Sequence, residues 1–248
     1  MNINNNDLLS YQTSLLEWDT KYFEVKSGRV NINSDLSENQ KKEINDFCSA
    51  FEFCTIVNKN NNNKINHWLG TESKAFLSDI NIQFEKSNLK QKATLDSTIY
   101  LTNSLEYNED IANIARNSFE FSRFFNDSNL PQLKSRNVYY QWVLSSFNQP
   151  NKYFIYQSIE DIITGFLLFS LDEVNKAVDI ELIAVNKNTK GKGIGKKLIS
   201  KLEMYSLEIK YDKINVGTQI KNSNAINFYQ SCGFKYISSN PIFHLWNI

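Results

Sequence analysis

The sequence predicts a mixed α/β (α+β) protein with a central mixed sheet flanked by helices. In the second half, short β-branched runs alternate with amphipathic segments of helical period. Three strand-like runs follow one another directly, at residues 152–157, 163–171 and 177–185. A glycine-rich turn then separates the last run from a helix that is expected to extend to about Lys210. Consecutive strands followed by a strand–helix–strand unit are typical of a sheet with both antiparallel and parallel neighbours.

The elements on either side of these strands have weaker signals. A short strand at 97–103 precedes an amphipathic helix at 108–119 and a loop at 120–131. We also expect a second amphipathic helix at 136–147, a strand at 213–219, a helix at 222–232 and a final aromatic strand pair, "FKYISS" and "IFHLWNI".

The first half predicts a smaller α/β domain. Residues 25–33 and 53–58 are typical of strands, and residues 37–51 form an amphipathic pattern that opens with Ser37, a good helix N-cap. The asparagine-rich run at 58–66 indicates a surface loop.

The domain junction is expected at residues 85–97, which are polar and have no sustained apolar period. This gives an N-terminal α/β domain at 1–95 and a second domain at 96–248. Because the junction is not rich in glycine or serine, we expect it to pack rather than to act as a flexible tether.

Composition restricts the function classes. The 248 residues carry 27 basic and 27 acidic side chains, a balance that gives no support to nucleic-acid binding. Three cysteines without paired spacing predict neither a disulfide framework nor a metal site. The polar start lacks a secretion-signal pattern, and no apolar run of about 20 residues could span a membrane. We therefore expect a cytoplasmic protein without metal.

Three of only 8 glycines, Gly191, Gly193 and Gly195, fall within five positions where a strand gives way to a helix. Bare backbone at a helix N-terminus offers N–H donors and the positive end of the helix dipole to an anion. Nearby lysines add charge, which suits a di- or triphosphate. The spacing matches neither the Walker loop nor the dinucleotide-binding fingerprint. A tight strand-to-helix turn without any ligand is the alternative.

Two motifs resemble the GCN5-related N-acetyltransferase (GNAT) superfamily. "LIAVNKNTKGKGIGKKLI" is similar to its acetyl-CoA signature, with Asn188 or Lys190 where the signature carries Gln or Arg. "NSNAINFYQSCGF" (222–234) is similar to its second hallmark, at the usual separation. The resemblance implies a GNAT fold and acetyl-CoA as the acyl donor.

The resemblance also implies roles for individual residues. The backbone of Ile183, Ala184 and Val185 would hold the pantetheine arm, and Asn222 would hydrogen-bond the cofactor. The pyrophosphate would be held by the glycine loop, namely Lys190, Gly191, Lys192, Gly193, Ile194, Gly195 and Lys196.

Tyr229 would protonate the departing thiolate as the general acid, because a phenol can donate a proton to sulfur as it leaves. Packing on a helix face is the alternative for this tyrosine. Glu181 is a candidate general base, with a structural carboxylate as the alternative. His67 and His244 have no visible partner and are interpreted as structural or surface residues.

Residues 14–30 and the segment around "FSRFFNDSNLP" resemble the dTDP-fucosamine acetyltransferase group, whose members acetylate the 4-amino group of a nucleotide-linked 4-amino-4,6-dideoxyhexose for surface polysaccharide. The resemblance makes Ser122, Arg123 and Asp127 candidates for the acceptor pocket, and a nucleotide-linked amino sugar the partner. The two resemblances together imply that the domain at 1–95 contributes to acceptor binding and that 96–248 is the acetyl-CoA-binding catalytic domain. Arg123 could equally be a structural ion-pair partner.

Two other hypotheses stay open: acetylation of another amine, such as a protein N-terminus, a polyamine or an antibiotic, and a non-catalytic acyl-CoA-binding domain. A homodimer through the final strand pair is an alternative to packing of that pair within one chain.

Overall fold

The computed structural model describes residues 9–90 and 96–247. Contacts between residues divide the chain into two compact units. Unit 1 runs to Ile82 and also includes Ser122–Ser135 and the chain from Ser238 onward. Unit 2 comprises Gln83–Phe121 and Arg136–Ile237. The strands β4 (Phe76–Lys86) and β10 (Lys235–Trp246) each contribute residues to both units.

Unit 1 is built on a four-stranded arrangement in the order β1-β2-β3-β10, in which β2 and β3 are parallel and the other neighbours antiparallel. Its remaining elements are β1 (Tyr11–Leu15), α1 (Glu17–Phe23), β2 (Ser27–Ile32), α2 (Glu38–Ser49), β3 (Phe53–Asn58), α3 (Asn63–Thr71) and most of α5 (Gln132–Arg136).

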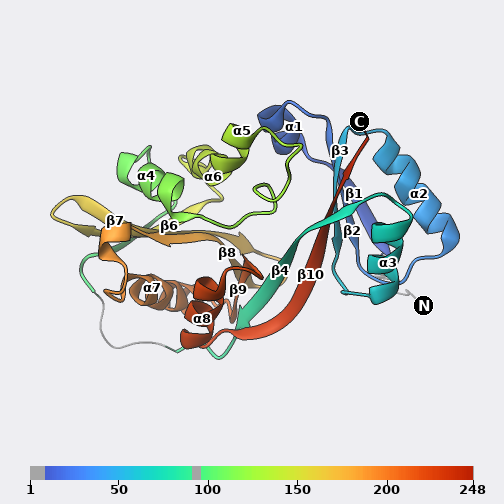
Figure 1. Cartoon of the computed structure of the whole chain (residues 1–248). Helices are drawn as coiled ribbons and strands as arrows, with labels where there is room; N and C mark the ends of the chain where they lie inside the picture. The colour runs from blue at the N-terminus through green and yellow to red at the C-terminus, as the bar shows by residue number, and fades with distance from the viewer. Residues whose placement is uncertain (1–8, 91–95, 248) are drawn as a thin grey trace. The chain divides into compact units, whose positions relative to one another are not determined.

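The hydrophobic core of unit 1 lies between its strands and the helices α2 and α3 (Figure 1). Helix α2 begins as expected at Ser37, whose side chain and that of Gln40 form a capping box. Alternate residues of β2 and β3, such as Val30 and Ile56, point into this core. The opposite face of the same strands carries Arg29 and Thr55, which are partners in the β2–β3 register.

Unit 2 contains a mixed sheet in the order β9-β8-β7-β6-β5, with β8 and β9 parallel and the rest antiparallel. Its elements are β5 (Ile99–Thr102), α4 (Glu109–Ser118), α6 (Val138–Ser146), β6 (Tyr153–Ile159), β7 (Ile162–Asp172), β8 (Ala177–Val185), the 3₁₀ turn η1 (Lys187–Thr189), α7 (Ile194–Glu208), β9 (Lys213–Gln219) and α8 (Ser223–Ser231). The mixed sheet flanked by helices confirms the predicted fold class.

Both faces of the unit 2 sheet are covered, with α4 and α6 on one side and α7 on the other (Figure 1). Residues 166–169 of β7 are therefore all fully buried, and two of them, Phe166 and Leu168, join α4 and α6 in one core cluster. A strand buried on both faces has a continuous apolar sequence, and this explains the run "GFLLF" from which the strand was predicted.

The predicted elements of the second half match the observed ranges closely, with one exception, and the short elements α5 and η1 were not predicted. The predicted final strand pair is wrong, because β10 is a single strand from Lys235 to Trp246. The chain continues through the residues between the two predicted strands without reversing. Residues 242–246 then pair with β3, so partners far along the chain determine the strand.

The first half contains elements that the sequence analysis missed. The loop predicted at 58–66 overlaps α3, whose first turn is capped by the side chain of Asn62. The asparagines hid a helix that buries Ile65, Trp68 and Leu69 at spacings of three and four residues. Helix α1 and strand β4 were not predicted either.

The compact units differ from the single division expected at residue 95. Unit 1 also takes residues 122–135 and the C-terminal segment, which the prediction assigned to the catalytic domain. The reason is long-range strand pairing, since β10 joins β3 across nearly 190 residues of chain, as between Ile242 and Val57. Part of the predicted junction, residues 91–95, lies outside the described residues.

Candidate functional site

An opening between β8 and β9 defines one side of the site. These parallel strands pair only over Ala177–Ile180 and Lys213–Val216, and they then diverge. Beyond Ile180, β8 keeps only its antiparallel partner β7. The described part of the chain therefore provides no strand partner for the free edge of residues 181–185, where backbone N–H and C=O groups face the opening.

The glycine loop forms the next wall. Gly191 and Gly193 have φ angles of 81° and 78°, in the left-handed region that side chains disfavour. Gly193 is the N-cap of α7, and the first backbone bond of the helix runs from the Lys197 N–H to the Gly193 carbonyl at 3.2 Å. The N–H groups at the start of the helix therefore have no intrahelical acceptor and are available to an anion.

Charge in the first turn of α7 supports anion binding. This turn has no acidic residue and carries Lys196 and Lys197, although cations are unfavourable at the positive end of a helix dipole. Lys197 pairs with Asp96 at 2.9 Å, which leaves Lys196 and the exposed Lys190 without an ion pair among the described residues. An anionic ligand in the loop would offset this excess of positive charge.

Gly195 brings α7 close to α8. A Cβ atom at this position would lie 3.0 Å from the Phe228 ring, so the absence of a side chain permits the helix and the ring to touch. Sequence reasoning assigned all three glycines to phosphate binding. The structure shows that two of them require positive φ and the third permits close packing.

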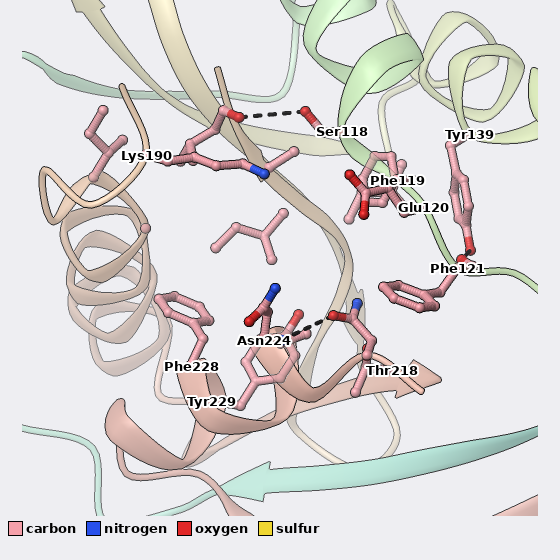
Figure 2. A pocket seen from close by; sticks show the side chains of 18 of the residues that line it. Ser118, Phe119, Glu120, Phe121, Tyr139, Lys190, Thr218, Asn224, Phe228 and Tyr229 are labelled. Carbon is pink, nitrogen blue, oxygen red and sulfur yellow. Dashed lines mark hydrogen bonds between the residues drawn. The ribbon is translucent and has the colours of Figure 1, made fainter. Parts of the chain in front are cut away.

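These elements enclose a cavity of about 470 Å³ within unit 2. It is lined by the diverging ends of β8 and β9, by the glycine loop and by the start of α8 (Figure 2). Every predicted cofactor-binding residue lines it except Lys192, which is exposed and donates its backbone N–H to the Thr189 carbonyl. Tyr229 and Glu181 also line the cavity, so the fold brings the two catalytic candidates together.

Tyr229 lies on α8 with its ring packed against Phe84, Phe228 and Phe234. Only 5% of the residue is exposed, and burial, with a smaller contribution from Cys232, raises the pKa of its phenol. Because its pKa is raised, the hydroxyl is protonated at neutral pH. It makes no hydrogen bond to another described residue and is therefore available to a ligand.

The C-terminal end of α8 is anchored by a buried ion pair. The Lys86 ammonium contacts the Glu203 carboxylate on α7 at 2.6 Å and also donates to the Cys232 carbonyl at 2.6 Å. This contact ties α8 to α7 two turns from the glycine loop and thereby fixes the helix that carries Tyr229.

Glu181 occupies an irregular position in β8. The β7–β8 register steps from Leu182 to Ile180 between two consecutive β7 residues, so Glu181 is the extra residue of a bulge. One carboxylate oxygen accepts from the Trp142 indole at 3.0 Å, and the other pairs with the Lys152 ammonium. Both oxygens of this predicted base are thus already engaged.

Asn222 is the N-cap of α8, and its side-chain oxygen accepts from the Ala225 N–H at 3.1 Å. The cap fixes the side chain in the cavity wall and leaves its NH₂ group available to a ligand. The predicted role in cofactor binding is compatible with this arrangement but is not required by it.

The three acceptor candidates, Ser122, Arg123 and Asp127, belong to unit 1, and none of them lines the cavity. Arg123 pairs with Asp19 at 3.5 Å, which corresponds to the alternative of a structural ion pair. Ser122 and Asp127 are buried.

Asp127 holds His244, the histidine for which the sequence showed no partner. Burial alone would raise the pKa of Asp127, but hydrogen bonds from His244 at 2.6 Å, from the Trp246 indole and from the Asn129 N–H keep it below the ordinary value. Burial lowers the pKa of His244, so a neutral ring donates from Nδ1 to the carboxylate. His244 is structural, as interpreted, whereas His67 is exposed.

The sequence analysis missed one wall of the cavity. Phe119, Glu120 and Phe121 follow α4 directly, and Tyr139 on α6 packs its ring 4.4 Å from that of Phe119. Phe119 and Tyr139 lie in the predicted helices at 108–119 and 136–147, and no role was expected for Glu120 or Phe121 in the loop at 120–131. The available signal was an aromatic–acidic–aromatic triplet immediately after a helix end.

Other kinds of site find no support in the described residues. Residues 9–90 and 96–247 contain no group of three or more His, Cys, Asp or Glu side chains arranged to hold a metal ion. None of the described helices has the length and apolar character needed to cross a bilayer.

Comparisons with known proteins agree with this geometry. The acetyltransferase (GNAT) family matches residues 109–234. The spore coat polysaccharide biosynthesis protein SpsD of Bacillus subtilis is 28% identical over 138 residues, which cover 56% of this chain and 47% of that protein. The N-acetylaspartate synthetase of Xenopus tropicalis is 29% identical over 89 residues, 36% of this chain and 33% of the relative. The matches therefore span less than half of either relative.

Among solved structures, a GCN5-related N-acetyltransferase from Sphaerobacter thermophilus superposes with a TM-score of 0.60 and 9% sequence identity, over 96% of this chain and 76% of that one. At this identity the likeness concerns the fold alone. The family match extends from the start of α4 to Phe234 and includes the diverging strands, the glycine loop and α8. The chain belongs to the acetyltransferase (GNAT) family.

Proposed function

We propose that this protein is an N-acetyltransferase that moves the acetyl group of acetyl-CoA to the 4-amino group of a nucleotide-linked 4-amino-4,6-dideoxyhexose. The observation that carries the proposal is a single cavity that joins an open strand edge, an anion-binding helix terminus and a buried tyrosine. These three features correspond to three parts of acetyl-CoA, namely the amide-containing arm, the pyrophosphate and the thioester.

The residues present fit acetyl-CoA. The free edge of β8 at Ile183–Val185 can hydrogen-bond an amide-containing chain as an added strand would, because its backbone groups face the opening. The glycine loop and Lys190 and Lys196 can hold the pyrophosphate. Acetyl-CoA, when bound, supplies an acetyl group activated as a thioester.

Tyr229 performs the acid step. Its hydroxyl carries a proton at neutral pH, because burial raises the pKa, and it can donate this proton to a thiolate as the carbon–sulfur bond breaks. The aromatic contacts on three sides hold the ring in place before the ligand arrives. A phenol confined in this way loses little rotational freedom on reaction.

Two relatives bear on the choice of acceptor. The curated relative SpsD is named for spore coat polysaccharide biosynthesis, which favours a sugar. The sequence of unit 1 also resembles an amino-sugar acetyltransferase group. N-acetylaspartate synthetase, the other relative, is named for an amino acid product, so another small amine is the second candidate.

A thiol-release assay with acetyl-CoA tests the proposal directly. The acceptor panel contains dTDP-4-amino-4,6-dideoxyglucose, its galactose epimer, aspartate, spermidine and a peptide with a free N-terminus. We expect rapid release with one of the two nucleotide sugars. Release with aspartate, spermidine or the peptide alone would discard the sugar while keeping the acetyltransferase. Tight CoA binding without release from any acceptor would favour a binding domain.

A further inference from the structure

The cavity contains two carboxylates with opposite environments. Among the described residues that line it, only Glu120 and Glu181 are acidic. Glu181 gives both oxygens to Lys152 and Trp142, and its side chain is 10% exposed. Glu120 is exposed and forms no hydrogen bond or ion pair with any residue in the described part of the chain. An unpaired carboxylate directed into a cavity is available to a ligand.

The position of Glu120 is fixed by its neighbours rather than by its own carboxylate. Helix α4 ends at Ser118, and the C-cap Phe119 has extended backbone angles, φ −98° and ψ 120°. The Phe119 ring packs on Tyr139 on one side of Glu120, and on the other side the Tyr139 hydroxyl donates to the Phe121 carbonyl at 3.0 Å. One tyrosine therefore holds both residues that flank Glu120.

Tyr139 is itself held by Gln219 at the end of β9, whose side-chain N–H group donates to the Tyr139 hydroxyl at 3.3 Å. Phe119, Glu120, Phe121 and Tyr139 lie together on one side of the pocket, across from Lys190 and Phe228 (Figure 2). The two sides therefore differ in chemistry. The glycine-loop side is cationic and suits phosphate, whereas the opposite side combines aromatic rings with a single negative charge.

An aromatic wall with one free carboxylate suits a primary ammonium group carried on a ring that has an apolar face. The aromatic rings can pack on the carbon face of a deoxysugar, and the carboxylate can accept a charge-assisted hydrogen bond from the nitrogen. A second phosphate or a carboxylate substrate would be repelled from the same position.

We propose that Glu120 is the residue that binds the acceptor ammonium and accepts its proton before attack, whereas Glu181 is a positioning residue that holds the β8 bulge through Lys152 and Trp142. This assignment rests on the proposed function and adds a catalytic residue that the sequence analysis did not identify.

The proton and electron balance is closed. The ammonium gives one proton to Glu120, and the nitrogen lone pair forms a bond to the acetyl carbonyl carbon. The carbon–sulfur bond breaks with its electron pair on sulfur, which takes the Tyr229 proton. The second proton on nitrogen returns to the Tyr229 oxygen as the amide forms. Glu120 then releases its proton to water, so each turnover yields one amide, one thiol and one free proton.

The test compares three glutamate variants in the full chain. Glu120→Gln removes the carboxylate, Glu181→Gln frees Lys152 from its partner, and Glu106→Gln makes the same charge change at an exposed residue outside the cavity. Turnover is measured with the amine that the wild-type protein acetylates best. Calorimetry with CoA present measures the binding of that amine and of its analogue with hydroxyl in place of the amino group. Thermal unfolding reports the stability of each variant.

We expect Glu120→Gln to lower kcat/KM for the amine at least 10²-fold, while the KM for acetyl-CoA and the unfolding midpoint stay unchanged. Its affinity for the amine should fall about 10- to 10²-fold with little change for the hydroxyl analogue. Formate added to Glu120→Gly should restore part of the rate, which a merely structural residue would not permit. Glu181→Gln should lower the unfolding midpoint, and Glu106→Gln should match the wild type.

A Glu120→Gln enzyme within threefold of wild-type kcat/KM would overturn the assignment, as would equal loss of affinity for amine and hydroxyl analogue. The assignment would also be overturned if Glu181→Gln, and not Glu120→Gln, lost the preference for the amine over its hydroxyl analogue. Failure of the proposed function gives a different result. A wild-type protein that acetylates no amine in the panel refutes both the proposed function and the role of Glu120. An active wild type with an active Glu120→Gln variant refutes only the role of Glu120.

Discussion

Asp127 in unit 1 and three polar side chains of the unit 2 cavity have opposite surroundings. In unit 1, Asp127 is 3% exposed and receives hydrogen bonds from His244, Trp246 and Asn129. In the unit 2 cavity, the side chains of Glu120, Lys190 and Tyr229 form no hydrogen bond or ion pair with a described residue. Buried polar groups that are mutually satisfied stabilise a fold, whereas positioned polar groups without partners are suited to a ligand.

The comparison teaches which predicted site residues can be judged from the sequence. Asp127 and Tyr229 were both singled out as functional candidates, and both are buried. Only the pattern of partners separates them, since Asp127 is surrounded by donors and Tyr229 by aromatic carbon. This difference predicts that substitution of Asp127 affects stability, whereas substitution of Tyr229 affects turnover.

The largest expected effect is that of Tyr229→Phe. Loss of the general acid should lower kcat by about 10²- to 10⁴-fold with a stability close to wild type, because the hydroxyl has no described partner. Burial raises the pKa of Tyr229, so the phenol is protonated across roughly pH 6 to 9 and the loss should be constant over that range. The measurement is a pH series of single-turnover thiol release.

A Tyr229→Phe enzyme with undiminished kcat would remove this residue from the catalytic list and leave it a packing residue of α8. In that case Glu120 and the glycine loop would be the groups of the cavity still assigned to a ligand.

Asp127→Ala should act on stability instead. It leaves the Trp246 indole and the Asn129 N–H without their acceptor and His244 without its partner, at a cost of about 3 kcal/mol in the free energy of unfolding. Chemical denaturation measures this change, and His67→Ala, at an exposed histidine of the same unit, provides a control expected within about 0.5 kcal/mol. A stable Asp127→Ala protein that loses acceptor affinity would instead support the predicted acceptor role.

A pair of glycine substitutions gives the smallest effects, with opposite signs. Gly193→Ala forces a side chain into a φ of 78° and should destabilise the protein by about 1–2 kcal/mol and raise the KM for acetyl-CoA. Gly70→Ala lies within α3 with nothing close to the added Cβ, so it should stabilise the protein by about 0.5–1 kcal/mol. Equal effects in thermal unfolding would argue against a special conformation at Gly193.

Much of the fold could be predicted because its signals are local. The capping box at Ser37, the apolar run of β7 and the glycine loop each act over a few residues, so the sequence indicated them closely. The helix α3 and the single strand β10 were not predicted. Asparagines near the start of α3 and a proline within β10 locally disfavour regular structure, and tertiary packing overrides this preference.

The candidate site divides along the same line. The glycines, Tyr229 and Asn222 could be named in advance, since each lies in a short motif that resembles a known family. Glu120 could not, because its significance depends on the absence of a partner and on Tyr139 from another helix. Glu181 was the predicted base instead, and the sequence does not reveal that Lys152 and Trp142, 29 and 39 residues away, occupy its carboxylate.

The sequence by itself determined the periodicity of most helices and strands, the backbone freedom of the glycine loop and the position of the tyrosine on its helix, since these depend on residue type and spacing. Tertiary structure alone decided which strands separate, which carboxylate is free and which histidine is buried, because hydrogen bonds and ion pairs join residues that are distant along the chain.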